Sequence, residues 1–384
     1  MSRRFPVTFY LALAANLFAW AGLQWVYVTL PGYIGSLGGG ATDIGLAYGL
    51  TALGVVVARP AAGRLADRWG RKPMLLLGAG VFSLCSALYA LLPSLLPFML
   101  VRLLQGAGLA AFTTAYTALI ADLAPPPRRG EAIGLSGMTS NLGLLFAPAL
   151  GASVQAAWGY GNHFLVASAI SSAGLALLLP VREPHRPEAE QAKAVSFWSV
   201  ARMQPIWIAA LGGTGVAVAY GAVLSFMAPQ AAARGLTAAA GYYTALALAL
   251  LVAQALAGRL SDRISRRAAA LPGLAIAGLS MAGLALARSN AGLLAAGAGL
   301  GLGWGLARTG LDSAVADASP PEARGAAFGF AYACFDLGVG TGSFALGVVA
   351  QGHGYAAAFA LAALWAAAAL TGYAVGTRTH PSAP

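Results

Sequence analysis

A segment that occurs twice limits the folds open to this chain. Residues 63–75 read GRLADRWGRKPML, and residues 258–267 repeat the pattern 195 positions later as GRLSDRISRR. Other residues recur at the same offset: Asp122 with Asp317, Pro125-Pro126 with Pro320-Pro321, Arg129-Gly130 with Arg324-Gly325, Gly143 with Gly338, Tyr160 with Tyr355 and Phe164 with Phe359. A constant offset over about a hundred residues predicts that the chain consists of two copies of one structural unit.

The composition places both copies in a membrane. Hydrophobic residues make up 59% of the chain and charged residues 9%, whereas soluble domains have about 25% charged residues. A helix needs about 20 apolar residues to cross a bilayer. Twelve segments are long enough: 6–29, 42–61, 73–92, 96–121, 132–156, 163–180, 205–228, 238–257, 268–287, 291–316, 326–350 and 356–376. We therefore predict an all-α membrane protein with 12 transmembrane helices in two pseudo-symmetric six-helix bundles.

The arrangement of the charges predicts the orientation of the chain. The net charge of +11 is also typical of proteins that bind nucleic acid, but the 23 Lys and Arg are concentrated at the termini, in alternate loops and in the middle of the chain. The remaining loops have only Arg234 and Arg288, and three more cations lie within apolar segments: Arg59, Arg102 and Arg308. This asymmetry follows the positive-inside rule. We therefore expect a bacterial cytoplasmic (inner) membrane protein with both termini in the cytoplasm and no nucleic-acid partner.

The segment between the two copies is the one long charged stretch of the sequence. We predict domains at residues 1–180 and 205–384, joined by a cytoplasmic linker at 181–204 in which residues 196–203 form a short interfacial helix. His163 and His353 are expected in short external loops. The apolar run 5–29 is too long for a signal peptide, so we expect a retained first helix. Both cysteines lie in apolar segments, and the sequence contains no nucleotide-binding loop, nucleophile–base arrangement, cofactor motif or metal-ligand cluster.

Two motifs resemble those of one transporter family. The segment 63–75 is similar to motif A of the major facilitator superfamily, and the R-x-x-Q-G-x-G signature of that family's fourth span is matched by Arg102, Gln105, Gly106 and Gly108. The antiporter signature of the fifth span is matched in part, because Ala147 precedes Pro148 where the family has glycine. The resemblance covers essentially the whole chain and points to the 12-span drug and metabolite:proton antiporters. It implies a transporter that works by alternating access, and not an enzyme.

The repeated segment is expected to act as a cytoplasmic gate. In its first copy, four cations surround the single carboxylate of Asp67, and two glycines are expected to allow a tight turn and a close approach of the helices. We also expect Arg68 and Arg71 to pair with Asp122. The predicted gate residues of both copies are Gly63, Asp67, Arg68, Gly70, Arg71, Asp122, Asp262, Arg263, Arg266 and Asp317. The alternative is a basic loop that only obeys the positive-inside rule, and the repeat argues against it.

Ionisable residues within apolar segments are costly and generally mark a transport pathway. Asp336 falls near mid-depth of the eleventh segment, and the residue 195 positions before it is Asn141. Because removal from water favours a neutral carboxyl group, Asp336 is the first candidate for a proton carrier. The other candidates for proton coupling are Arg102, Asp312 and Arg308. The alternatives are a fixed Arg308–Asp312 ion pair at i, i+4 spacing, a structural role for Arg102, and an Asp336 that never changes protonation.

Polar and aromatic residues on the same spans predict a substrate cavity with a mostly apolar wall. The candidates are Asn16, Trp20, Gln24, Thr113, Tyr116, Thr117, Asn141, Tyr220, Tyr243 and Trp304. For each of them the alternative is helix packing or a place in an aromatic belt. The spacing of Gly297, Gly301 and Gly305 predicts close helix packing in the tenth span.

These features predict a monomeric, proton-coupled exporter of small amphipathic molecules such as drugs, metabolites or metallophores. Its partners are a small-molecule substrate, protons and the lipid bilayer, with no cofactor and no metal. The alternative is a proton-coupled uptake symporter of a small organic anion, because Arg102 and Arg308 could receive a carboxylate. A passive channel or a membrane sensor agrees poorly with the paired charged gates.

Overall fold

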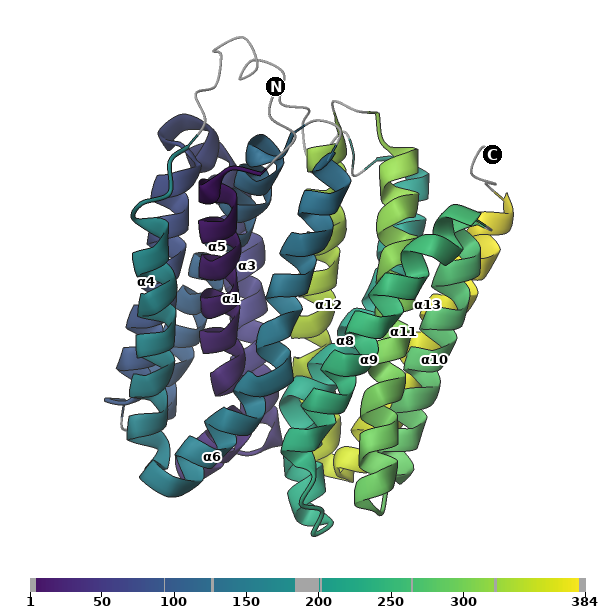
Figure 1. Cartoon of the computed structure of the whole chain (residues 1–384). Helices are drawn as coiled ribbons and strands as arrows, with labels where there is room; N and C mark the ends of the chain where they lie inside the picture. The colour runs from purple at the N-terminus through teal and green to yellow at the C-terminus, as the bar shows by residue number, and fades with distance from the viewer. Residues whose placement is uncertain are drawn as a thin grey trace. The chain divides into compact units, whose positions relative to one another are not determined.

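The described part of the chain consists of helices and the turns that join them. The computed structural model describes residues 5–92, 94–125, 128–183, 200, 202–263, 265–320 and 323–379, with no strand among them. In chain order the helices of Figure 1 are α1 (Val7–Tyr27), α2 (Leu30–Ser36), α3 (Ala41–Trp69), α4 (Arg71–Tyr89), α5 (Leu95–Leu123), α6 (Arg129–Leu178), α8 (Gln204–Ala233), α9 (Ala239–Arg263), α10 (Arg266–Leu286), α11 (Asn290–Ala318), α12 (Arg324–His353) and α13 (Tyr355–Thr379).

The predicted membrane spans are all present as helices. Within the described residues, nine helices are both long and apolar enough to cross a bilayer. The element α6 contains two spans that meet at Gly159, where φ is 76° and ψ is 175°. Helices α9 and α11 occupy the places predicted for the eighth and tenth spans. The all-α membrane fold is therefore confirmed.

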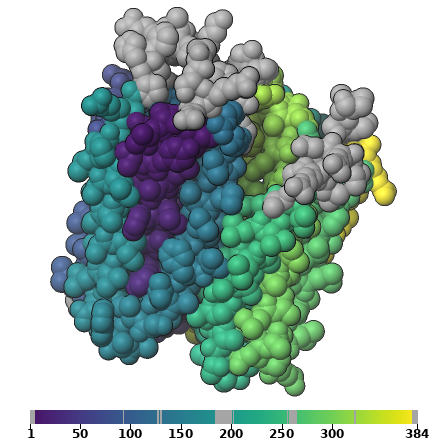
Figure 2. Space-filling model, viewed as in Figure 1, coloured from purple at the N-terminus to yellow at the C-terminus, as the bar shows by residue number. Residues whose placement is uncertain are grey.

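The helix contacts divide the chain into two compact units. The first comprises Met1–Gly39 and Leu50–Glu188, and the second comprises Gly40–Gly49 and Ala189–Pro384. In the first unit α1 packs on α6, and α4 packs on α5 and α6; Figure 2 shows α1 in purple between two stretches of α6. In the second unit α8 packs on α12 and α13, and α10 packs on α11 and α13. These elements are equivalent at the 195-residue offset, so both units are built from one packing scheme.

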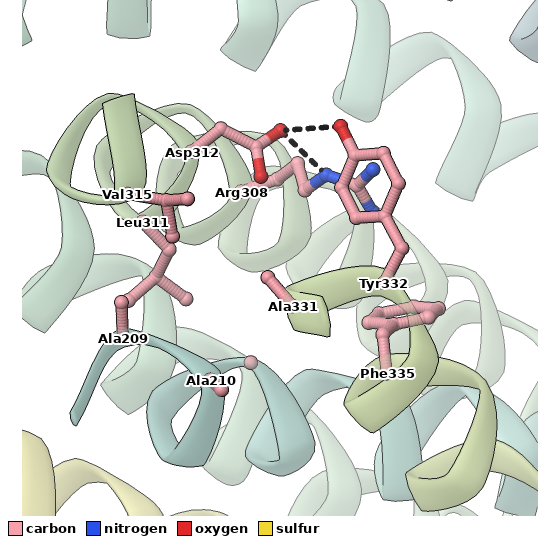
Figure 3. Close-up of a pocket in the computed structure, with 10 residues that line it drawn as sticks. Ala209, Ala210, Arg308, Leu311, Asp312, Val315, Ala331, Tyr332 and Phe335 are labelled. Carbon is pink, nitrogen blue, oxygen red and sulfur yellow. Dashed lines mark hydrogen bonds and ion pairs between the residues drawn. The ribbon is translucent and has the colours of Figure 1, made fainter. Parts of the chain in front are cut away.

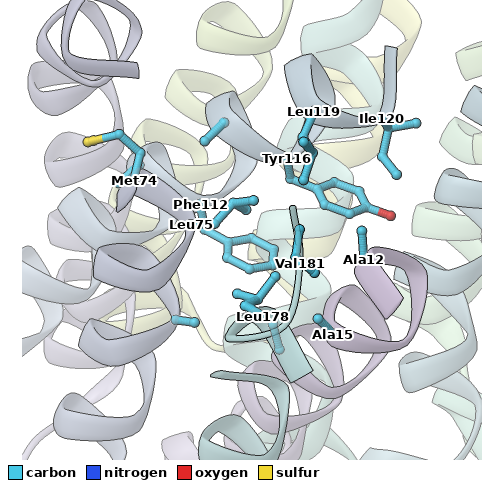
Figure 4. Packing of buried hydrophobic residues seen from close by; sticks show 14 of the residues in the cluster. Ala12, Ala15, Met74, Leu75, Phe112, Tyr116, Leu119, Ile120, Leu178 and Val181 are labelled. Carbon is cyan, nitrogen blue, oxygen red and sulfur yellow. The ribbon is translucent and has the colours of Figure 1, made fainter. Parts of the chain in front are cut away.

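Small and apolar side chains hold each unit together. Figure 4 shows the first unit's cluster, in which Phe112 and Tyr116 stack at 5.8 Å between ring centroids, near Met74 and Leu75. Lipid tails are as apolar as this interior, so close packing contributes more to helix association here than removal of apolar surface from water.

Glycines set the closest helix crossing in both units. A Cβ atom added at Gly106 would collide with the carbonyl oxygen of Thr51, and one added at Gly301 would collide with that of Leu246. These two pairs are equivalent at the 195-residue offset, so α3 crosses α5 in the first unit as α9 crosses α11 in the second. The close packing predicted for the tenth span is confirmed.

Two predictions about the loops are wrong. The segment 63–75 is not a loop, because α3 continues to Trp69 and α4 begins at Arg71. Gly63 lies inside α3, and a Cβ atom placed there would meet no described neighbour within 4 Å, so it supports neither a turn nor a close approach. His163 lies in α6 and is completely buried, not in an external loop. The interfacial helix expected at 196–203 falls mostly outside the described residues.

Candidate functional site

The predicted gate of the first unit centres on one buried cation. Arg71 is the first residue of α4, and its side chain is 7% exposed. Its Nη1 lies 2.7 Å from Oδ1 of Asp67 in the last turns of α3, and its Nε lies 3.7 Å from Oδ2 of Asp122 near the end of α5. Three helices therefore meet at this arginine. Arg68, expected to pair with Asp122 in the outward-facing state, is exposed here and forms no ion pair with the described residues.

The turn between α3 and α4 depends on a carboxylate from the start of the linker. Gly70 has a φ of 100°, the left-handed region that glycine tolerates best. Glu183 accepts hydrogen bonds from the backbone N–H groups of Arg71 (2.7 Å) and Lys72 (3.2 Å). A Cβ atom at Gly70 would lie 2.7 Å from Oε2 of Glu183. Glu183 thus satisfies two of the free N–H groups at the beginning of α4 and complements the positive end of its dipole.

The second unit repeats the ion pair but not the cap. Nε of Arg266 lies 2.8 Å from Oδ2 of Asp317, and these residues are the equivalents of Arg71 and Asp122. Ser265 stands in place of Gly70, with an extended φ of −175°, and its own side chain accepts a hydrogen bond from the N–H of Ala268. The side chains of Asp262 and Arg263, also predicted for this gate, lie outside the described part of the structure.

A second set of equivalent contacts ties each gate to the last helix of its unit. Nζ of Lys72 donates to the carbonyl oxygen of Leu179 at 2.6 Å, and Nη2 of Arg267 donates to that of Ala374 at 3.1 Å. Both pairs are related by the 195-residue offset. The arginine–aspartate pair and the contact with the last helix thus occur in both units, and Ser265 takes the place of Glu183 in the second.

Arg102 belongs to a buried polar cluster near the beginning of α5 in the first unit. Its side chain is completely buried on α5, and it donates to Oε1 of Gln105 one helical turn further on. The same oxygen accepts the hydroxyl hydrogen of Tyr89 on α4 at 2.9 Å. The guanidinium carbon of Arg102 lies 5.9 Å from the ring centre of Tyr27 on α1. The signature R-x-x-Q therefore links three helices through one cation.

Arg308 and Asp312 form an ion pair in a pocket of the second unit (Figure 3). Nε of Arg308 lies 2.7 Å from Oδ2 of Asp312, and the two side chains are 30% and 31% exposed. The hydroxyl of Tyr332 on α12 donates to the same carboxylate oxygen at 3.4 Å. The guanidinium carbon of Arg308 lies 4.3 Å from the ring centre of Tyr332. The i, i+4 ion pair, the alternative to a role in proton coupling, is present in the structure, and Tyr332 contacts it.

Aromatic rings extend this pocket along α11 and α12. Trp304 and Phe335 stack at 6.3 Å with an interplanar angle of 20°, and Trp304 packs on Tyr220 of α8 at 4.5 Å. Small residues of α8 form the opposite wall: Ala209, Ala210 and Gly213. The pocket therefore combines a flat apolar surface with one internally neutralised ion pair.

The polar residues predicted on α1 contact α6 within the first unit. Asn16 is completely buried, and its Nδ2 donates to the hydroxyls of Thr139 and Ser140, each at 2.9 Å. Nε2 of Gln24 donates to the carbonyl oxygen of Ser140 at 3.2 Å. The side-chain carbonyl oxygens of both amides are buried without a hydrogen-bond partner in the described residues. This leaves two acceptors for water or for a bound donor.

The other predicted cavity residues differ in their surroundings. Thr113 and Thr117 bond to carbonyl oxygens of their own helix, while Trp20 and Tyr116 lie on α1 and α5 of the first unit. Tyr243 is 1% exposed and donates to the carbonyl oxygen of Val223 at 3.5 Å, so it is enclosed in the packing of α8 and α9. Asn141 and Asp336 are both half-buried, each the thirteenth residue of its helix.

The sequence analysis did not identify the contacts made by four residues: Glu183, Tyr332, Phe335 and His163. Glu183 was read only as linker charge, although it lies three residues after the sixth predicted span and has no counterpart in the second copy, where Arg378 occupies its place. Tyr332 and Phe335 carry the signal of aromatic residues close to Asp336 on one helix. His163 offers no such signal. Its partner Thr29 is distant in sequence, and its partner Gly151 lies on the other side of the bend at Gly159.

Comparison with known proteins adds a family and a set of relatives. The family model described as Major Facilitator Superfamily matches residues 10–251 and 237–384. The chain is similar to Multidrug resistance protein 2 of Bacillus subtilis, with 29% identity over 165 residues that cover 43% of this chain and 41% of that protein. It is also similar to a multi-drug resistance efflux pump PmrA homolog of Lactococcus lactis, with 27% identity over 352 residues that cover 86% and 84% of the two chains.

A likeness to solved structures concerns the fold alone. A bacterial homolog of the human lysosomal transporter Spinster, in an inward-facing and unoccupied conformation, matches with a TM-score of 0.78 at 19% identity, covering 97% of each chain. The human organic anion transporter MFSD10 matches with a TM-score of 0.70 at 18% identity, covering 95% of this chain and 98% of the other. The alignment with the Bacillus subtilis protein spans less than half of that relative's length.

Proposed function

Because the chain belongs to the Major Facilitator Superfamily, we propose that this integral membrane protein exports small amphipathic molecules in exchange for protons, by alternating access. Similarity to proteins named as multidrug efflux pumps supports the export of small molecules. Transport, and not enzymatic conversion, is the activity typical of such relatives. Both termini are proposed to lie in the cytoplasm of a bacterial cell, with the protein acting as a monomer in the inner membrane.

The pocket of the second unit is the observation that carries this proposal. Trp304 and Phe335 offer a flat apolar surface, and the ion pair of Arg308 and Asp312 lies beside it. Such a combination suits molecules with a ring system and a polar end. The two unpartnered amide oxygens of Asn16 and Gln24 provide further acceptors in the first unit.

The same contacts disfavour the alternative of anion uptake. Arg308 already has a carboxylate partner at 2.7 Å, and Arg102 is completely buried against Gln105. A substrate carboxylate with no positive charge of its own would place a second anion beside Asp312, or would have to reach Arg102, which has no exposed surface. The export of amphipathic molecules in general requires neither.

Proton coupling is proposed to involve Asp336, with Arg102, Arg308 and Asp312 as the other candidates. Asp312 has its countercharge beside it in Arg308, whereas Asp336 lies in the middle of α12. Families of this type bind substrate and coupling ion near the middle of the bilayer. Asp336 is therefore the residue that we propose as the proton carrier.

Transport by the purified protein in liposomes tests the proposal. We expect a fluorescent amphipathic dye to accumulate inside vesicles when the lumen is made acidic, because protons leaving the lumen would drive the dye inward. Collapse of the pH gradient with a protonophore should abolish accumulation. Equal dye movement with and without the gradient would reject proton coupling, and no movement in either condition would reject transport of this class of molecule.

A further inference from the structure

The ion pair in the second unit's pocket has the composition of a receptor for a zwitterion. Arg308 and Asp312 lie one turn apart on α11, and in the described residues each is the other's ion-pair partner. Nearly a third of each side chain is exposed. The guanidinium group contacts the carboxylate through Nε, which leaves its Nη donors for another acceptor. Asp312 uses Oδ2 for both Arg308 and Tyr332, which leaves Oδ1 for another donor.

A ligand with a single charge is poorly matched to this pair. A cation that binds Asp312 would weaken the contact with Arg308, and an anion that binds Arg308 would weaken the contact with Asp312. Either event leaves one charge without its partner in surroundings made of Phe335, Trp304 and the alanines of α8. Breaking one side of a shielded ion pair costs more than the pair itself contributes.

A zwitterion satisfies both members of the pair at once. Its carboxylate or other compact anion would bind the free Nη donors of Arg308 as a two-pronged acceptor. Its ammonium group would bind Oδ1 of Asp312. The total charge of the pocket stays at zero when the ligand is bound, so no charge has to be left unpaired.

The aromatic wall supplies the remaining contact. Trp304 and Phe335 are nearly parallel, with an interplanar angle of 20°, and Phe335 lies 5.5 Å from the guanidinium carbon of Arg308. Flat ring systems stack on such surfaces. We propose that this pocket selects zwitterionic amphiphiles, with the ring system on Trp304 and Phe335, the anionic group on Arg308 and the ammonium group on Asp312. The proposal rests on the proposed export function and names the substrate class for it.

Binding to the purified full-length protein in detergent tests this selection without requiring transport. Four naphthyl compounds share one ring system and differ in charge: naphthylalanine is a zwitterion, naphthylethylamine a cation, naphthylpropionate an anion and naphthylethanol neutral. Their dissociation constants would be measured at neutral pH by quenching of tryptophan fluorescence and by calorimetry. We expect naphthylalanine to bind about tenfold more tightly than naphthylethylamine or naphthylpropionate. A factor of this size lies between the small contribution of an exposed ion pair and the large cost of breaking a buried one.

Variants of Arg308 and Asp312 should give opposite preferences between the cationic and the anionic compound. Arg308→Gln should favour naphthylethylamine over naphthylpropionate, and Asp312→Asn should favour naphthylpropionate over naphthylethylamine. Thr309→Val is the matched control, because its hydroxyl bonds to the carbonyl oxygen of Gly305 in its own helix and it is absent from the pocket lining. This control should preserve the wild-type order of the four compounds.

The wild-type series remains decisive even if a variant fails to fold. Binding of naphthylethylamine or naphthylpropionate as tight as that of naphthylalanine would overturn the proposal, as would an unchanged order in both folded variants. The exchange Arg308→Asp with Asp312→Arg keeps the pocket neutral and should retain the preference for the zwitterion. A zwitterion preference without pH-driven transport would instead reject the proposed export function and leave the selectivity of the pocket in place.

Discussion

At the scale of single residues, the two units differ in the group that accepts hydrogen bonds from the free backbone N–H groups at the start of α4 and of α10. The start of α4 is capped by Glu183 from the linker, whereas the start of α10 is capped by the hydroxyl of Ser265. Arg378, in the last turn of α13, occupies the position equivalent to Glu183, so the second copy has no carboxylate there. A serine in the second copy supplies the missing acceptor locally. The departure of the second copy from the first is therefore a compensated change.

Substitution of Gly70 tests the backbone requirement at this turn. Gly70→Ala should lower the free energy of unfolding by about 1–2 kcal/mol, because a Cβ atom is strained at positive φ and would press on Glu183. The matched control is Gly63→Ala, which lies in open space inside α3 and should be neutral or stabilise the protein by about 0.5–1 kcal/mol. Thermal unfolding of the purified variants measures both effects. Equal behaviour of the two alanines would contradict the assigned roles.

His163 provides a second prediction at this scale. Its Nδ1 must carry a proton to donate to the carbonyl oxygen of Gly151 at 3.0 Å, so its Nε2 accepts from the hydroxyl of Thr29 at 2.8 Å. His163→Leu would leave buried polar groups unsatisfied and should lower the free energy of unfolding by about 2 kcal/mol. His353→Leu, at an exposed helix end, is the control and should have little effect. A similar unfolding temperature for both variants would show that the buried contacts of His163 contribute nothing.

At the scale of helices, the sequence predicts where the spans lie far better than how they end. Apolar length and the 195-residue offset can be read from the sequence without knowledge of contacts, and they predict the two spans that α6 contains on either side of Gly159. The ends depend on partners elsewhere in the chain. Glu183 is more than a hundred residues from Gly70, and no local pattern connects them. The loop expected at 63–75 was wrong for a different reason. The polar residues of this segment indicated exposure to solvent, but an exposed segment can still be helical, and α3 continues to Trp69.

The ion pairs of the gate are also an element-scale feature, since they join the ends of three helices. Asp67→Asn should leave the fold intact, because the side chain is 52% exposed and such pairs contribute about 1 kcal/mol or less. It should nevertheless slow transport about fivefold. The substitution would destabilise one conformer of the transport cycle by about 1 kcal/mol, which changes its population by about that factor. Glu131→Gln removes a comparable exposed pair with Arg128 outside the gate and should transport at the wild-type rate. Wild-type turnover in the Asp67 variant would exclude its carboxylate from the gating step.

At the scale of the whole molecule, the two units share a framework and differ in chemistry. Gate pairs, helix crossings and the contacts of Lys72 and Arg267 recur at the common offset. The cations within the spans do not recur. Gly297 occupies the position equivalent to Arg102, and Thr113 occupies the position equivalent to Arg308. The duplicated contacts therefore belong to the framework that both units share, and the unmatched charges are the candidates for substrate and proton chemistry.

Asp336 and Asn141 are the clearest case of such a divergence, and they carry the last prediction. Each is the thirteenth residue of its helix, about 18 Å from the helix start at about 1.5 Å per residue. The amide at Asn141 shows that the shared framework accepts an uncharged group at this position. Asp336→Asn should therefore fold, bind the transported dye with nearly wild-type affinity and still exchange it across the membrane. It should fail to accumulate dye in response to a pH gradient, because an amide cannot take up and release the proton. Asn141→Asp alone is the control for an added charge at the equivalent depth, and it should retain pH-driven accumulation. If the Asp336 variant accumulates dye as the wild type does, Asp336 is not the proton carrier, and the coupling has to be sought at Asp312 and Arg102.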